Sequence, residues 1–293
     1  MKITLLGTGS PTPMINRASS GLMVEIGDEV LLFDHGGRAH DRFLRTGRKA
    51  TEVNTLFLSH LHSDHCLDYA QLVHSRWDQG AGLIPELRVY GPDYTARMTE
   101  LLFAEGGVFD PDIRGRLNSA GSQRVYLNRG GILPRRRPAP DVVALRDGQV
   151  IEGGAWQVTV REVCHQPGWI QAFGFRLECD EGVFVYSGDT GPCEGISALA
   201  HRADVLVHMC YFISGTFKPN ARLTASGHME AARLAAEQEV RTLVTTHFTP
   251  QMEPPGLRER CIAEMAQVYS GRIIWGEDLL QIPLEAEKVG EVG

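Results

Sequence analysis

The chain has 293 residues, 43% of them hydrophobic and 22% charged, and its formal net charge is −7. This composition predicts a soluble globular protein with a large core, built as one large α/β domain or two modest ones. The negative charge argues against general nucleic-acid binding. No apolar run is long enough to cross a membrane, and the first residues predict a strand and a turn rather than a signal peptide, so we expect a cytoplasmic protein.

Short apolar runs alternate with turns in the first third of the chain. They predict strands at residues 3–6, 22–26, 30–33, 55–58 and 87–90, and helices at 69–77 and 93–105. Gly27-Asp28 is typical of a hairpin turn. Because hairpins occur beside crossover connections, we expect a mixed sheet and not a purely parallel one.

Residues 106–140 differ from the segments on either side, since Gly and Pro are frequent and apolar periodicity is weak. Seven arginines and no acidic residue lie between Arg114 and Arg137. This pattern predicts an irregular, arginine-rich insertion. It suits a solvated loop or a dimer contact as well as an arm that recognises an anionic group.

The strand pattern returns after residue 141. Strands are expected at residues 158–163, 173–178, 183–187, 205–208 and 242–246, with helices at 195–201 and 228–239. Ser226 is a plausible N-cap for the second helix. The second half thus repeats the strand-rich character of the first, which fits two packed sheets with helices outside them.

The strongest chemical signal follows the predicted strand at 55–58. His60, His62, Asp64 and His65 lie within six residues, directly after Ser59. Imidazole and carboxylate ligands suit zinc, iron or manganese. Four such side chains would cost much desolvation in a core without a metal to share. The turn therefore predicts ligands for two metal ions and a metallohydrolase.

Other potential ligands also stand at the ends of apolar runs, namely His165, Asp189, His208 and His247. Strand ends that gather on one sheet edge build a rigid site from distant parts of the sequence. The six cysteines contain no Cys-x-x-Cys pair, so neither a disulfide framework nor a zinc ribbon is indicated.

The pattern His-x-His-x-Asp-His after a hydrophobic strand resembles the signature of the metallo-β-lactamase superfamily. The resemblance implies an α/β fold, an αββα sandwich of two packed mixed sheets, with residues 1–293 as a single domain and 106–140 as its insertion. It implies two divalent ions, expected to be zinc, with manganese or iron as alternatives. It implies seven ligands: His60, His62 and His165 for the first ion, Asp64, His65 and His247 for the second, and Asp189 bridging both.

Two further segments resemble the ribonuclease Z and arylsulfatase-like branch. They are the opening Leu6-Gly-Thr-Gly-Ser-Pro-Thr-Pro13 and the Gly-His-Met-Glu-Ala-Ala run that contains His228. In that branch the histidine matching His228 donates a proton near the leaving group. Asp34 is placed like a family aspartate that supports the ligands.

Three features depart from the branch. Met209 stands where ribonuclease Z enzymes carry a glutamate that pairs with the proton-donating histidine, and a thioether cannot relay a proton. Asp68 stands where the motif usually continues with glycine. Its carboxylate could hydrogen-bond to a metal ligand from outside the site, or it could be a favourable negative charge at the start of a helix. No clear tRNA-gripping arm is evident, although the arginine-rich segment lies roughly where one could sit.

These departures favour a binuclear metal-dependent hydrolase of a small-molecule ester, which could be a sulfate, a phosphate, or a carboxylic ester or lactone. In the implied mechanism a metal-bridged hydroxide attacks the ester, Asp64 orients it and His228 protonates the leaving oxygen. The alternative is a ribonuclease Z-like tRNA 3′-processing endonuclease, with tRNA as a less favoured partner. A non-catalytic binding module is opposed by the complete ligand set. The resemblance also allows a homodimer.

Overall fold

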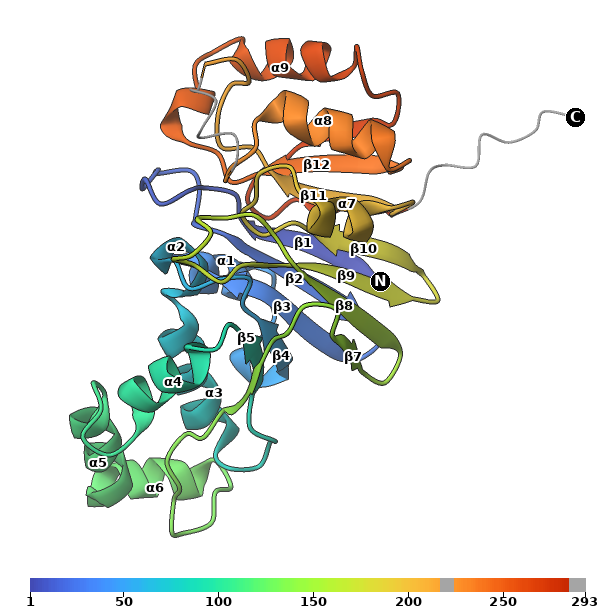
Figure 1. The fold of residues 1–293 in the computed structure, drawn as a ribbon. Coiled ribbons are helices and arrows are strands. Elements are labelled where there is room, and N and C mark those ends of the chain that lie inside the picture. Colours follow the sequence, from blue (N-terminus) through green and yellow to red (C-terminus); the bar gives the residue numbers. More distant parts are fainter. Residues whose placement is uncertain (217–223, 285–293) are drawn as a thin grey trace, which may run out of the picture.

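Two seven-stranded sheets pack against each other with helices on their outer faces (Figure 1). The computed structural model describes residues 1–216 and 224–284. The expected αββα sandwich of two mixed sheets is therefore confirmed. Within these residues, no helix combines the length and apolar character that crossing a bilayer requires.

The first sheet is antiparallel at one side and parallel at the other. Its strands pair in the order β14-β1-β2-β3-β4-β5-β6, antiparallel as far as β3 and parallel from there on. Gly27 takes a φ of 55° in the expected hairpin between β2 and β3. The strands are β1 (Lys2–Gly7), β2 (Gly21–Ile26), β3 (Glu29–His35), β4 (Val53–Phe57), β5 (Arg88–Gly91), β6 (Asp141–Ala144) and β14 (Gln281–Ile282).

The second sheet has the same mixed character. Its order is β13-β12-β11-β10-β9-β8-β7, antiparallel from β7 to β10 and parallel from β10 to β13. The carboxyl ends of the parallel strands in each sheet lie at a common edge, where loops can converge. The strands are β7 (Val150–Glu152), β8 (Trp156–Glu162), β9 (Phe173–Cys179), β10 (Gly182–Tyr186), β11 (Val205–Met209), β12 (Thr242–Thr246) and β13 (Arg272–Trp275).

An aromatic core joins the sheets. Phe33 and Phe57 stack with ring centroids 4.9 Å apart, and Phe175 and Phe184 from the second sheet contact Phe33 at 5.5 and 5.6 Å. All four side chains are fully buried. Such offset and edge contacts favour one relative position of the sheets, which fixes the loops that leave their common edge.

The helices cover the outer faces. Residues of α1 and α3 pack on the first sheet, and residues of α7, α8 and α9 pack on the second. The helices are α1 (Ala39–Arg45), α2 (Ser63–Cys66), α3 (Tyr69–Gly80), α4 (Thr95–Phe103), α5 (Asp110–Asn118), α6 (Ala120–Asn128), α7 (Glu194–Ala200), α8 (His228–Glu237) and α9 (Leu257–Met265), with 3₁₀ turns η1 (Ala50–Glu52) and η3 (Pro250–Met252).

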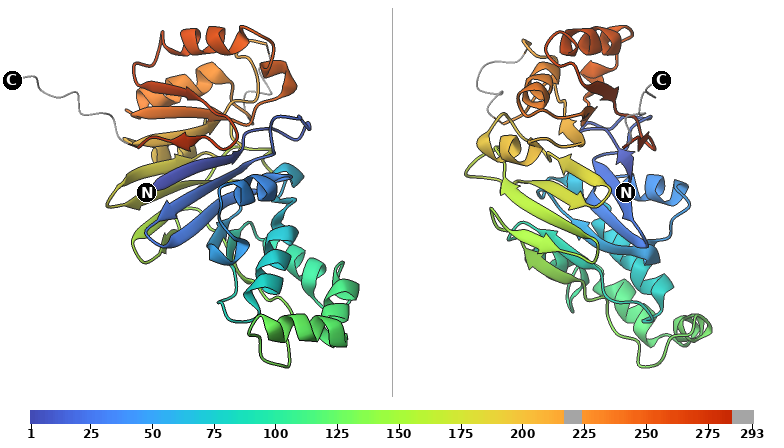
Figure 2. Two further views of the ribbon diagram at one scale, coloured as in Figure 1. Left: turned by 180° about the vertical axis from the view of Figure 1, so that it is seen from behind. Right: turned by 90° about the vertical axis from the view of Figure 1, so that its right-hand side faces the viewer.

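The arginine-rich insertion is more regular than its sequence predicts, because it contains α5 and α6. These green helices protrude from the sandwich in all views (Figure 2). Arg114 and Arg116 form ion pairs with Asp110 and Asp112 one turn earlier, and the Ser119 hydroxyl caps α6. Charge pairs and caps therefore stabilise these helices, which explains why apolar periodicity did not reveal them.

Candidate metal centre

The predicted ligands lie on loops and on the short helix α2 at the edge where the two sheets meet. In the first sheet, β4 ends at Phe57 and the chain runs through His60 into α2. In the second sheet, loops after β8, β10 and β12 carry His165, Asp189 and His247. Segments far apart in sequence are thus held together by two rigid sheets.

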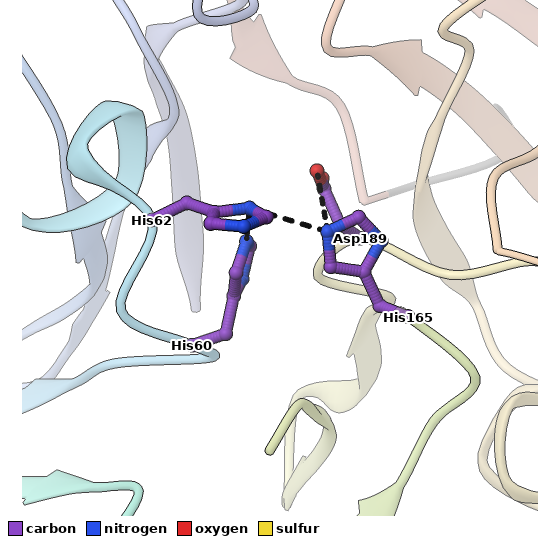
Figure 3. A group of neighbouring side chains, drawn as sticks. All are labelled: His60, His62, His165 and Asp189. Atoms are coloured by element: carbon purple, nitrogen blue, oxygen red, sulfur yellow. Dashed lines mark hydrogen bonds and ion pairs between the residues drawn. The ribbon is translucent and has the colours of Figure 1, made fainter. Parts of the chain in front are cut away.

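The first group of ligands contains His60, His62, His165 and Asp189, whose donor atoms lie within 4.8 Å of one another (Figure 3). His62 Nδ1 is 3.0 Å from His60 Nε2 and 3.2 Å from His165 Nε2. Asp189 Oδ2 lies 4.0 Å from His165 Nε2. Three imidazoles and a carboxylate thus converge on one point, as in a tetrahedral cation site.

The second group contains Asp64, His65 and His247, again with donor atoms within 4.8 Å. Asp64 Oδ2 is 3.1 Å from His247 Nε2 and 3.4 Å from His65 Nε2. Asp189 reaches this group too, at 3.2 Å from His247 and 3.5 Å from His65. Asp189 therefore lies between the groups, where a bridging carboxylate is expected. The structure brings all seven predicted ligands together.

Asp34 orders the hydrogen bonds behind the ligands. It is completely buried, and its carboxylate accepts from His65 Nδ1, from the backbone and hydroxyl of Ser59, and from the Tyr186 hydroxyl, each at 2.7 Å. Because the Ser59 hydroxyl donates to Asp34, it accepts from His60 Nδ1 at 3.0 Å. Both histidines are thereby held with Nε2 free to bind a cation, as metal-ligating histidines usually are.

The donor set fits divalent cations. Burial lowers the pKa of His60 well below its ordinary value, which keeps the ring neutral. Although burial acts to raise the pKa of Asp189, the charges of His247 and His65 hold it well below its usual range. Neutral imidazole and ionised carboxylate are the forms that bind metal. Burial acts to lower the pKa of His65, but Asp189 and Asp34 raise it well above its ordinary value, so a cation at this ring would displace a proton. In addition, His65 Nε2 is buried with no hydrogen-bond partner among the described residues, although it faces two carboxylates.

Sequence relatives identify the chain. It matches the family described as Beta-lactamase superfamily domain over residues 32–248. It is 34% identical over 294 residues to the Ribonuclease Z of Mycobacterium avium (strain 104), a match that covers 98% of this chain and 99% of that relative. The chain belongs to the metallo-β-lactamase superfamily. Its resemblance to the ribonuclease Z-like branch is confirmed, and the protein is a metal-dependent hydrolase.

Two crystal structures share this metallo-β-lactamase fold. The metallo-beta-lactamase fold protein YhfI from Bacillus subtilis has a TM-score of 0.71 at 20% identity, covering 96% of this chain and 99% of that one. Human tRNase Z, short form, has a TM-score of 0.67 at 19% identity, covering 97% and 100%. At these identities the likeness establishes the fold, and the superfamily implies divalent metal ions at the two groups.

The cavity over this metallo-β-lactamase site has a volume of about 230 Å³. Met209 and Tyr211, which follow one another closely at the end of β11, line it together with four of the ligands. Met209 also accepts a hydrogen bond on its sulfur from the Thr190 backbone at 2.9 Å. The position where the branch carries glutamate thus presents an apolar side chain to the cavity. Sequence reasoning did not single out Tyr211, which carries no motif signal of its own.

His228 is not brought to the ligands in the way that the branch implies. The side chain is fully buried, and the described residues that line the cavity do not include it. His228 Nε2 lies 2.7 Å from a Glu264 carboxylate oxygen, and Nδ1 accepts from the Ser214 backbone at 3.2 Å. Glu264 comes from α9, 36 residues along the chain, so no local pattern could have revealed it. The assignment of His228 as a proton donor stays a prediction.

Two other polar residues near the site have structural roles. His208 is buried and its Nδ1 donates to the Met209 carbonyl at 2.9 Å, while burial lowers its pKa to about 4. It belongs to neither ligand group among the described residues. Asp68 accepts from the His40 backbone at 3.0 Å and so ties α1 to the start of α3.

Proposed function

We propose that this protein is an endonuclease of the ribonuclease Z type that removes 3′ extensions from precursor tRNA. The observation that carries the proposal is identity of 34% to a Ribonuclease Z over nearly the whole chain, with a complete two-group ligand set. This reverses the order expected from the sequence, where small-ester hydrolysis came first. Zinc as the metal and a cytoplasmic location are parts of the proposal.

The chain's own residues divide the work at the site. His60, His62 and His165 would hold one cation, Asp64, His65 and His247 would hold the other, and Asp189 lies between the two groups. When bound, two such cations lower the pKa of a water molecule and polarise the phosphoryl oxygen under attack. We expect Asp64, whose Oδ2 lies between His65 and His247, to orient the attacking water by accepting a hydrogen bond from it. The cavity above them, of about 230 Å³, has room for a phosphate group.

The test is cleavage of a precursor tRNA with a 3′ trailer by the metal-replete protein. We expect release of the trailer, loss of activity with a chelator, and loss of activity in Asp189→Asn. A gel shift at low salt measures binding separately, because phosphate contacts make it salt-sensitive. Failure of the metal-replete protein to bind or cleave precursor tRNA at low salt would refute the proposal.

The second candidate is hydrolysis of a small-molecule ester. Met209 favours it, because this side chain replaces the glutamate of ribonuclease Z and gives the cavity an apolar wall. Turnover of bis-p-nitrophenyl phosphate, p-nitrophenyl sulfate and a p-nitrophenyl carboxyl ester tests it. High turnover of one of these substrates, with no action on precursor tRNA, would establish this candidate instead.

A further inference from the structure

A second hollow adjoins the first ligand group. Its volume is about 350 Å³, and its lining includes Leu61, Tyr94, Trp169 and Ile170. Leu61 lies between the ligands His60 and His62, and Trp169 lies four residues after His165. The hollow, here called the aromatic groove, therefore shares two loops with the metal site, and its other side is the segment between β5 and α4 that contains Tyr94.

The groove presents two aromatic rings to solvent. Trp169 is 90% exposed and Tyr94 is 60% exposed. Tryptophan side chains are usually well buried. A solvent-exposed indole beside a candidate catalytic centre therefore indicates a binding surface. Aromatic rings placed in this way serve as surfaces on which unpaired bases stack.

Hydrogen bonds hold the two sides of the groove in place. The Trp169 and Ile170 backbone amides both donate to the Gln166 carbonyl, at 3.0 and 3.1 Å. The Gln171 side chain accepts from the Asp93 backbone at 2.9 Å, which ties this loop to the segment between β5 and α4. The groove is thus largely preformed, and a ligand need not order it on binding.

The one acidic residue among the described residues that line the groove is neutralised by an ion pair. Asp93, the acidic residue of the lining, is paired with Arg146. Tyr94 directly precedes α4, which leads to the arginine-rich helices α5 and α6 (Figure 1). In that insertion the exposed Arg124 and Arg136 have no carboxylate within 4.0 Å in the described part of the chain. These guanidinium groups are available to the phosphates of an RNA that also reaches the insertion.

We propose that Trp169 and Tyr94 form a stacking platform for a nucleobase of the unpaired 3′ segment of an RNA substrate. This rests on the proposed function and names the part of the substrate that the groove holds. The base stacks on the indole while the neighbouring phosphate lies toward the metal site, with which the groove shares two loops. Such stacking is sequence-tolerant, because every base has a flat face.

Tryptophan fluorescence tests the contact directly. Trp156 and Trp275 are buried and Trp77 is partly buried, so Trp169 is the tryptophan most accessible to a base. We expect a short single-stranded RNA to quench the fluorescence of the metal-loaded protein. The quench should disappear in Trp169→Phe, which keeps an aromatic ring. An unchanged quench in that variant would overturn the proposal.

Affinity tests whether stacking contributes to binding. We expect Trp169→Ala to weaken binding of the same RNA, and to raise the KM for precursor tRNA, about 10-fold. Trp169→Phe should keep most of the RNA affinity and a KM close to that of the wild type. Tyr94→Ala should weaken RNA binding and raise the KM, as Trp169→Ala does. Val150→Ala is the control, since it shortens an exposed apolar side chain on β7, outside the groove.

The outcomes separate this proposal from the function on which it rests. Normal cleavage of precursor tRNA with an unchanged KM in Trp169→Ala would overturn the platform and leave the endonuclease intact. The other outcome is that the wild-type protein neither binds nor cleaves RNA, while Trp169→Ala raises the KM for an aryl ester. This result would overturn both the platform and the endonuclease function, and it would make the groove a binding site for aryl groups.

Discussion

Asp34 shows how much one buried residue can decide. It adopts a φ of 58°, in the left-handed region that Asp and Asn enter more readily than other residues with side chains. In this conformation its carboxylate meets Ser59, His65 and Tyr186, which come from both sheets. It thereby fixes the tautomers of two ligands without lying in either ligand group.

Replacing Asp34 by Asn should weaken metal binding about 10–100-fold. Asn tolerates the same backbone conformation, so the substitution removes the negative charge that holds His65 and leaves the turn in place. Competition against a chelator of known affinity measures the effect. Tyr186→Phe is the matched control, because it deletes one donor to Asp34, and an equal affinity in Asp34→Asn and wild type would disprove the positioning role.

The hydrogen bonds of His228 predict a role in stability. His228→Ala should lower the free energy of unfolding by about 1–3 kcal/mol, because it leaves the Ser214 N–H without its acceptor in a partly buried setting. Denaturant unfolding measures this loss. Glu264→Gln, which keeps a side chain of the same size opposite His228, serves as the control.

The same His228→Ala variant tests the proton-donor assignment. Rates are compared across phosphodiesters with leaving groups of different pKa. A general acid requires the largest loss for the poorest leaving groups. Equal losses for all leaving groups would exclude His228 from that role and leave it as a residue that anchors α8 to α9.

At the scale of elements, arginines of the helical insertion both attach it to α3 and give it positive charge. Asp78 on α3 pairs with Arg116, Arg129 and Arg135, and Arg135 also lies over the Trp77 ring at 3.8 Å. These contacts fasten α5 and α6 to α3. Because Asp78 is shared by three arginines and Asp110 by two, the insertion keeps an excess of positive charge.

Neutralising this charge should change the salt dependence of RNA binding. In a double variant, Arg124→Gln with Arg136→Gln, we expect the slope of log Kd against log salt to fall by about 2. The control is Arg202→Gln with Arg241→Gln, which removes two exposed arginines that pair with acids on the second sheet's side. Equal slopes in the double variant and wild type would favour the solvated-loop or dimer-contact interpretation.

Most of the strands left apolar patterns that predicted them, whereas the short strands β6, β7, β13 and β14 were missed. The candidate ligands could be predicted because the histidine turn carries a family signature. His60, Asp189 and His247 each follow an apolar run that ends at the sheet edge, so strand ends and ligands were found together. The pairing of His228 with Glu264 leaves no such pattern, since it depends on how α8 packs on α9. The platform of Tyr94 and Trp169 was missed for the same reason, because packing brings two unrelated loops side by side.

At the scale of the molecule, the metal centre joins the two sheets. His60, His62, Asp64 and His65 extend from the first, whereas His165, Asp189 and His247 extend from the second. Ions bound here contact both sheets at once. Metal binding and the docking of the sheets are therefore thermodynamically linked.

Removing the metal should lower the melting temperature of the whole protein. A ligand whose free concentration is about a thousand times its Kd stabilises the native state by about 4 kcal/mol, provided that it does not bind the unfolded chain. Thermal unfolding with and without a chelator measures the shift, and Asp189→Asn should show a smaller one. Identical melting curves for the metal-loaded and metal-free protein would contradict this linkage.

The order of the ligands along the chain has a consequence for its synthesis. A ribosome releases His60, His62, Asp64 and His65 early, Asp189 only after another hundred or so residues, and His247 last. Until β12 has emerged, the second group lacks His247, so a nascent chain offers only a partial set of donors. Tight metal binding would therefore require synthesis of the parts of the chain that form both sheets. A chain that ends before residue 247 would lack a complete site.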